Sequence, residues 1–121
     1  MINIPDSVTA IGERAFVQCS GLTEFTIPAG VTVISRVTFA ECTGLTTITI
    51  PKGVTEIGEL AFYECSNLIN VYIPESVVTF GDNVFYNHHE SLTIYGVSGS
   101  TAQTYAIENG IQFSAEETPE S

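Results

Sequence analysis

The chain repeats itself every 23 residues, and this period constrains its fold more than any other feature. Four positions of the repeat hold the same residue in every unit: Ile4, Ile27, Ile50 and Ile73; Pro5, Pro28, Pro51 and Pro74; Val8, Val31, Val54 and Val77; Phe16, Phe39, Phe62 and Phe85. The polar positions vary between units. A chain with such a period folds as a solenoid, because one coil cannot bury its apolar side alone and each coil stacks on the next.

Each unit holds two short segments whose residue pattern predicts strands. In the first, apolar and polar residues alternate as in a strand with one buried side, and these segments are 25–27, 48–50, 71–73 and 92–95. The second has the form Val-x-x-Ile or Val-x-x-Phe, and these segments are 8–11, 31–34, 54–57 and 77–80. We expect each strand to pair in parallel with its equivalent in the next coil, about 4.8 Å away.

Turns are expected between these strands. A proline follows three of these first strands, at Pro28, Pro51 and Pro74, and ends each strand because it lacks an N–H to donate. Gly30 and Gly53 are expected to have positive φ in the turn that follows. A small residue follows the second strand, where we expect a sharp bend, and it is Gly12, Ser35, Gly58 or Gly81. From there to the Cys position the chain is expected to form a single 3₁₀ or α-helical turn.

The fourth unit departs from the repeat and indicates that the array ends there. Two residues are missing between Phe85 and the following strand, and Gly96 stands where proline is expected. Residues 100–103 have the form of a helix capping box, and Gly110 is typical of a helix end. We therefore predict repeats over 1–95, a cap over 96–113 with a short helix and a last strand, and a disordered acidic tail over 114–121.

Cys19, Cys42 and Cys65 occupy one position of the repeat, and His88 takes that position in the fourth unit. A Cys₃His zinc site is disfavoured, because ligands spaced one per coil lie on a line and cannot converge on one metal ion. A disulfide between adjacent coils is closer to feasible but would leave one cysteine over. Buried free thiols that act as small apolar residues are favoured.

The net charge is −11, from 14 acidic residues against 3 basic ones. Nucleic acids are therefore disfavoured as partners, because phosphate binding requires Lys and Arg. No apolar run is long enough to insert into a membrane, and the first residues do not form a signal peptide. Because the chain opens in mid-repeat, we expect it to be part of a longer array or to associate end to end through an uncapped N-terminal edge.

Enzymatic chemistry is not indicated. The sequence has no nucleophile–base motif, phosphate loop or dinucleotide fingerprint. Glu56 and Glu59 are expected on a solvated surface. Residues 88–90, His-His-Glu, could bind a metal or respond to pH, but an exposed loop at the end of the array is favoured. We predict a protein that is not an enzyme and that has no cofactor.

The unit Leu-x-x-Ile-x-Ile-Pro-x-x-Val-x-x-Ile-Gly-x-x-Ala-Phe-x-x-Cys resembles the BspA type of leucine-rich repeat. Residues 45–65 carry the whole motif, and the likeness extends over 1–95. The ending around Tyr95-Gly96 is similar to the way such arrays close. The sequence departs from the motif at Ser35, Thr38, Phe80, Val84 and His88.

This resemblance implies a leucine-rich-repeat solenoid, a right-handed β/α superhelix of stacked parallel strands with short 3₁₀ or helical turns and a cap that contains a helix. It also implies a secreted or surface-anchored protein of anaerobic bacteria or mucosal protists. Some members of the family are implicated in adhesion to host matrix proteins and in coaggregation. The family implies no enzymatic activity.

The outward positions of the first strands form the candidate binding surface. They are Glu24, Thr26, Thr47, Thr49, Asn70, Tyr72, Thr93 and Tyr95. Tyr72 and Tyr95 are the strongest candidates, because tyrosine combines apolar area with a polar group and is enriched at interfaces. The alternative is a solvated sheet in which Thr is present for its β propensity.

Two functions compete on this basis. The first is a module of an adhesin-like protein that binds a host or neighbouring-cell protein or glycan through this sheet. The second is a spacer with no ligand of its own, for which Tyr72 and Tyr95 would be unimportant. A third, a metal-binding or hydrolytic domain, would require a metal site or a pocket that gathers carboxylates.

Overall fold

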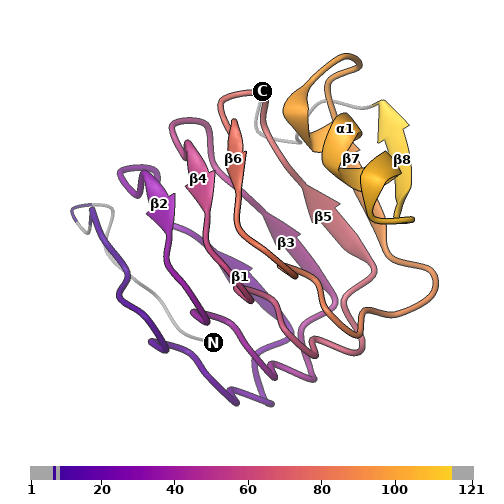
Figure 1. Cartoon of the computed structure of the whole chain (residues 1–121). Helices are drawn as coiled ribbons and strands as arrows, with labels where there is room; N and C mark the ends of the chain where they lie inside the picture. The colour runs from indigo at the N-terminus through magenta and orange to yellow at the C-terminus, as the bar shows by residue number, and fades with distance from the viewer. Residues whose placement is uncertain (1–6, 8, 116–121) are drawn as a thin grey trace.

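The computed structural model describes residue 7 and residues 9–115, and the remaining residues, 1–6, 8 and 116–121, lie outside the description. The chain winds into stacked coils, and a helix and a last strand follow the fourth coil (Figure 1). The elements in chain order are β1 (Glu24–Thr26), β2 (Val33–Ile34), β3 (Thr47–Thr49), β4 (Glu56–Ile57), β5 (Asn70–Tyr72), β6 (Thr79–Phe80), β7 (Thr93–Gly96), α1 (Thr101–Glu108) and β8 (Gln112–Ala115).

The first strands of the coils form a five-stranded parallel sheet in the order β1-β3-β5-β7-β8. Equivalent residues of the repeat lie side by side in it, so that Ile48 pairs with Phe25 on one side and with Val71 on the other. The second strands form a parallel sheet in the order β2-β4-β6, and an isolated bridge from Ile11 to Ile34 continues it into the first coil. The predicted parallel stack is thus confirmed.

The core between the two sheets consists of columns of equivalent apolar residues of the repeat. The rings of Phe16, Phe39, Phe62 and Phe85 stack in one row, with centroids 5.5, 5.4 and 5.3 Å apart. The inward residues of the sheets are buried beside this row, among them Ile34, Ile48, Ile57 and Ile94. One buried polar residue, Thr38, donates its hydroxyl to the carbonyl oxygen of Ser35 at 2.7 Å. The fixed positions of the repeat are therefore the positions that fill the core.

The third side of each coil, from the small residue to the Cys position, differs from the prediction. We call these four stretches the turn segments; they are 12–19, 35–42, 58–65 and 81–88. They contain successive turns instead of the expected 3₁₀ or α-helical turn. Two residues in each have φ between 54° and 64°, and these are Arg14 and Gln18, Val37 and Glu41, Leu60 and Glu64, Asn83 and Asn87. Positive φ at these positions interrupts a right-handed helix.

The turn segments form a third ladder of hydrogen bonds between coils. The N–H groups of Val37, Phe39 and Glu41 donate to the carbonyl oxygens 22 residues further on, at distances of 3.1, 2.9 and 2.6 Å. Intervening N–H groups close turns within the segment, as from Ala40 to Val37. In this ladder the donors point toward the C-terminal end of the stack, whereas Gly58 and Gly81, at the start of their segments, donate to the preceding coil at 2.7 and 2.8 Å.

Close contact between coils explains the small residue that begins each turn segment. A Cβ at Gly58 would lie 2.7 Å from the backbone nitrogen of Arg36, and one at Gly81 would overlap the backbone of Glu59. Gly12 has open space at the same position. Of the two glycines expected to have positive φ, Gly53 has φ of 107°, whereas Gly30 is not among the residues with positive φ.

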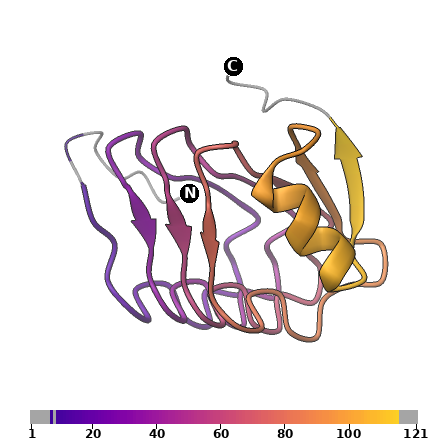
Figure 2. The same ribbon diagram turned by 45° about the horizontal axis from the view of Figure 1, so that its top comes forward.

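A helix and a strand cover the end of the stack (Figure 2). The Ser100 side chain accepts from the N–H of Gln103, as the capping box predicts, whereas the Gln103 side chain accepts from the N–H of Gly99 at 2.7 Å, one residue before the N-cap. Gly110 has φ of 69° after the helix, as predicted. The last strand, β8, runs to Ala115, so the two residues 114 and 115, assigned above to the tail, belong to the sheet.

Candidate binding surface

The five-stranded sheet places the predicted outward residues in two straight columns. One column runs Glu24, Thr47, Asn70 and Thr93, and the other runs Thr26, Thr49, Tyr72 and Tyr95. The backbone positions of Glu24 and Thr26 are those predicted, but their side chains lie outside the description. The other six side chains are half-buried. We call the outward surface of β3, β5, β7 and β8 the sheet face.

Hydrogen bonds and ring stacking order the middle of the sheet face. The rings of Tyr72 and Tyr95 stack with centroids 4.6 Å apart and planes 18° from parallel. The Tyr95 hydroxyl donates to Oδ1 of Asn70 at 3.0 Å, and Nδ2 of Asn70 donates to the Thr47 hydroxyl at 3.5 Å. One connected set of side chains therefore spans three strands, and its aromatic part is fixed in position before any partner arrives.

The sheet face extends one strand further than the sequence predicted. In β8, Gln112 continues the column of Thr93, and Ser114 continues the column of Tyr95. The Thr93 hydroxyl donates to Oε1 of Gln112 at 3.2 Å. The alternation of Gln112, Phe113 and Ser114 was the available signal, but the acidic composition that begins at Ser114 hid it.

The comparison with protein families decides the identity of the repeat. The model described as "BspA type Leucine rich repeat region (6 copies)" matches residues 1–112. The chain belongs to this family. A search of the curated proteins found no match.

Solved structures with the same fold come from several bacteria. A leucine-rich repeat protein from Bacteroides capillosus is 38% identical with a TM-score of 0.65, over 74% of this chain and 63% of that one. One from Bacteroides ovatus is 30% identical with a TM-score of 0.64, over 77% of this chain and 26% of that one. A leucine-rich repeat protein from T. pallidum shares the fold at 24% identity and a TM-score of 0.56, over 73% of this chain and 52% of that one. The chain thus spans less than two thirds of each of these proteins.

The cysteines of this BspA-type array contribute to the packing between coils. Cys42 and Cys65 are buried free thiols, and each donates its S–H to a carbonyl oxygen of the preceding coil at 3.0 Å, to Phe16 and Phe39 respectively. Burial raises the pKa of Cys42 to about 11 and that of Cys65 to about 12, despite the opposing hydrogen bond from the backbone of the preceding cysteine. The third, Cys19, is a half-buried free thiol.

The two histidine side chains of residues 88–90 form hydrogen bonds to neighbouring backbone groups. Nδ1 of His88 lies 2.8 Å from the carbonyl oxygen of His89, and Nδ1 of His89 accepts from the N–H of Ser91 at 2.9 Å. Among residues 7 and 9–115, no group of three His, Cys, Asp or Glu side chains could hold a metal ion. Glu59 forms a solvated ion pair with Arg36 at 3.1 Å, and Glu56 is exposed.

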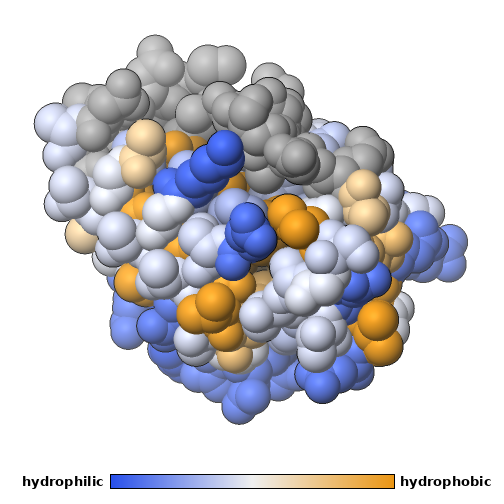
Figure 3. Space-filling model, turned by 90° about the horizontal axis from the view of Figure 1, so that it is seen from above, coloured by the Kyte–Doolittle hydropathy of each residue, from blue (hydrophilic) through white to orange (hydrophobic). Residues whose placement is uncertain are grey.

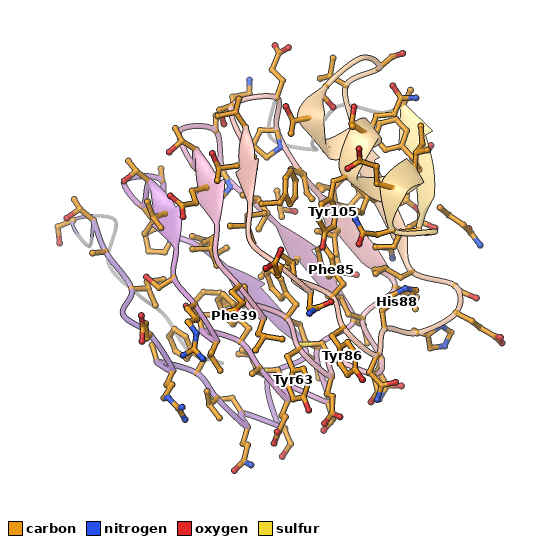
Figure 4. The ribbon with its side chains drawn as sticks, in the orientation of Figure 1. Phe39, Tyr63, Phe85, Tyr86, His88 and Tyr105 are labelled. Atoms are coloured by element: carbon orange, nitrogen blue, oxygen red, sulfur yellow. The ribbon has the colours of Figure 1, made fainter. Side chains whose placement is uncertain are left out.

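A second tyrosine pair lies on the turn segments. The rings of Tyr63 and Tyr86 stack with centroids 5.5 Å apart, and both labels lie at the same edge of the molecule in Figure 4. The carboxylate of Glu64 raises the pKa of Tyr63, with smaller contributions from burial and from Glu41. This pair has the same chemistry as Tyr72 and Tyr95 but belongs to another side of the coils, so Tyr63 offers a control for the sheet-face tyrosines.

Large apolar side chains are exposed singly. They are Val33, Val78, Tyr86 and Ile107. On the side seen in Figure 3, hydrophobic residues form small patches separated by hydrophilic ones. In the part of the chain that the structure describes, no helix is long and apolar enough to cross a membrane.

Proposed function

We propose that the chain is a binding module of a secreted or surface-exposed protein and that it binds a partner protein or glycan through the sheet face. The observation that carries this proposal is the stacked pair Tyr72–Tyr95, held by hydrogen bonds through Asn70 to Thr47 in the middle of a sheet that spans five strands. An ordered aromatic surface loses little side-chain entropy when a partner binds, and this favours affinity.

The chemistry of this surface restricts the partner. The six described predicted residues are hydroxyl, amide and phenol side chains without charge: Thr47, Thr49, Asn70, Tyr72, Thr93 and Tyr95. Such groups donate and accept hydrogen bonds and pack against apolar area, as at antibody-like interfaces. Nucleic acid is disfavoured by the net charge of −11. A protein or glycan surface rich in neutral polar groups fits best.

The decisive experiment measures binding of the purified chain to a panel of extracellular-matrix proteins and glycans. The test variant is Tyr72→Ala/Tyr95→Ala, and the control is Tyr63→Ala. Each removes tyrosine side chains that stack across adjacent coils. Circular dichroism and thermal unfolding establish that each variant is folded.

We expect saturable binding that Tyr72→Ala/Tyr95→Ala weakens at least about tenfold and that the control retains. Equal affinity of the test variant and the unmodified chain would contradict the proposal. The absence of binding across the panel would instead support a spacer, in which the repeats only hold other parts of a longer protein apart.

A further inference from the structure

A groove lies where the last coil meets the cap helix. It consists of two adjoining pockets with volumes of about 210 and 380 Å³. Both are lined by Asn83, Tyr105 and Asn109, so they are continuous, and we call them together the junction groove. Figure 4 shows Tyr105, Phe85 and His88 gathered at this end of the stack. The groove belongs to the turn segments and α1 and is separate from the sheet face.

Unpaired backbone donors line this groove. In the third coil, the N–H groups of Leu60, Phe62 and Glu64 donate to carbonyl oxygens of the fourth turn segment at 3.2, 2.9 and 2.9 Å. The equivalent residues of the fourth turn segment are Asn83, Phe85 and Asn87. The chain continues into the cap there, and no described residue accepts from these three N–H groups. All three residues line the smaller pocket.

Such a row of donors favours a ligand with oxygen acceptors. A backbone N–H that lacks a partner is unfavourable unless water or a ligand satisfies it. The three N–H groups occupy every second residue and, by the pattern of the earlier coils, point the same way along the stack. Their partial positive charges therefore add, as in other concave sites made of successive N–H groups in turns.

The surrounding charges favour a neutral ligand over an anion. No lysine or arginine is among the described residues that line the groove, and Asp82 and Glu108 line its larger pocket. The chain as a whole carries a net charge of −11. An anion would therefore be repelled, whereas hydroxyl groups can accept from the N–H row and donate to the two carboxylates.

The remaining lining residues offer groups that suit hydroxyls and apolar ring faces. Asn83, Asn87 and Asn109 contribute amides, which both donate and accept. Nδ1 of His88 faces a carbonyl oxygen, so it carries the proton in the neutral ring and leaves Nε2 as an acceptor. Tyr86 is 53% exposed and lines the smaller pocket.

We propose that the junction groove binds a neutral saccharide. Sugar hydroxyl oxygens accept from the N–H groups of Asn83, Phe85 and Asn87, and the C–H face of the sugar ring packs against Tyr86. A second sugar unit in the larger pocket donates hydroxyl protons to Asp82 and Glu108. This site is independent of the sheet face and goes beyond the function proposed above.

The test is a titration of the ¹⁵N-labelled chain followed by amide chemical shifts in NMR spectra. The probes are maltose, cellobiose, lactose and N,N′-diacetylchitobiose, each up to about 10 mM, with sodium acetate as the anionic comparison. We expect at least one disaccharide to shift the amide signals of Asn83, Phe85 and Asn87 saturably. The absence of such shifts with all four sugars, or saturable shifts with acetate alone, would overturn the proposal.

Variants test whether the sugar binds in the groove or elsewhere on the surface. Tyr86→Ala should weaken sugar binding about tenfold, whereas Tyr63→Ala, in the same column one coil earlier, should leave it unchanged. Asn83→Gly/Asn87→Gly should also weaken it and should fold, because glycine adopts the positive φ of 54° and 64° at these sites. Tyr72→Ala/Tyr95→Ala should retain sugar binding in the groove. Equal weakening by Tyr63→Ala and Tyr86→Ala would contradict the assignment to this groove.

Discussion

The sheet side and the turn side of each coil stack on their neighbours in different ways. On the sheet side, ordinary strands pair in parallel, and β8 continues the pairing beyond the fourth coil. On the turn side, every second residue donates to the next coil, the residues with positive φ among them, and this ladder stops at the fourth turn segment. The sheet side is therefore extended by the cap, whereas the turn side ends with three N–H groups from which no described residue accepts.

This difference determines which groups of each side can bind a ligand. On the sheet side the backbone of the fourth coil pairs with β8, so the outward side chains of the sheet face are the groups that can recognise a partner. The turn side ends in backbone donors beside α1, so recognition there can use the main chain itself. The two candidate sites follow from two ways of ending the same repeat.

The largest expected effect distinguishes the inward from the outward positions of the sheet side. Ile50 is fully buried next to β3, and Ile50→Asp would place a charge in the core, which should lower the free energy of unfolding by more than about 4 kcal/mol. Thr49→Asp, one residue earlier on the sheet face, should change it by less than about 1 kcal/mol. Urea unfolding followed by circular dichroism measures both. Equal losses would mean that the strand register is wrong.

On the turn side, a comparison of two glycines tests the close approach of the coils. Gly81→Ala should lower the free energy of unfolding by about 1–3 kcal/mol, because its Cβ would overlap the backbone of Glu59. Gly12→Ala meets open space and should be neutral or stabilise by about 0.5 kcal/mol. Thermal unfolding of the two variants is the measurement. A loss at Gly12 as large as that at Gly81 would contradict the stacking described here.

The buried thiols predict a dependence of stability on pH. Burial raises the pKa of Cys65 from 9.0 to about 12, so the folded state holds this proton more tightly than the unfolded state does. The stabilisation is therefore complete below about pH 9 and is lost as the pH rises from there toward 12. The free energy of unfolding should fall by about 1 kcal/mol for each buried thiol between pH 8.5 and pH 10.

Urea unfolding at these two pH values checks this prediction, with Cys42→Ala/Cys65→Ala as the control. The double variant should lose about 2 kcal/mol less than the unmodified chain over the same interval. If the free energy of unfolding falls equally in both proteins, ionisation of the thiols does not cause the dependence on pH.

The smallest effect concerns the residues with positive φ. Val37 has φ of 63°, which is unfavourable for a β-branched residue, whereas the fourth coil has Asn83 at the equivalent position. Val37→Asn should therefore raise the free energy of unfolding by about 0.5–1 kcal/mol, and Asn83→Val should lower it by about 1 kcal/mol. Thermal unfolding of the two variants measures both changes. A lower free energy of unfolding in both variants would show that the packing of Val37 outweighs its backbone strain.

The sheet side could be predicted from the sequence, and the turn side could not. Alternation of apolar and polar residues specifies which side chains face inward, and the 23-residue period specifies the register, so the two columns of the sheet face follow directly. The turn segments gave no such signal. Val37 and Leu60 are residues that rarely adopt positive φ, and only contacts between coils hold them there.

The ends of the array were harder to predict than its middle. The capping box at Ser100 identified α1, but the length of β8 depends on pairing with β7, which the composition of residues 114–115 does not indicate. The junction groove depends on how α1 lies over the fourth coil. The available signal for the groove was Asn83 and Asn87. Only in the fourth coil does asparagine occupy both positions with positive φ.

The most direct test of the proposed function is the affinity of the unmodified chain, Tyr72→Ala/Tyr95→Ala and Tyr63→Ala for the same matrix protein or glycan. We predict that loss of the sheet-face tyrosines weakens binding at least about tenfold, while loss of Tyr63 on the turn side leaves it unchanged. Undiminished binding by a folded Tyr72→Ala/Tyr95→Ala variant would contradict the sheet face as the binding surface.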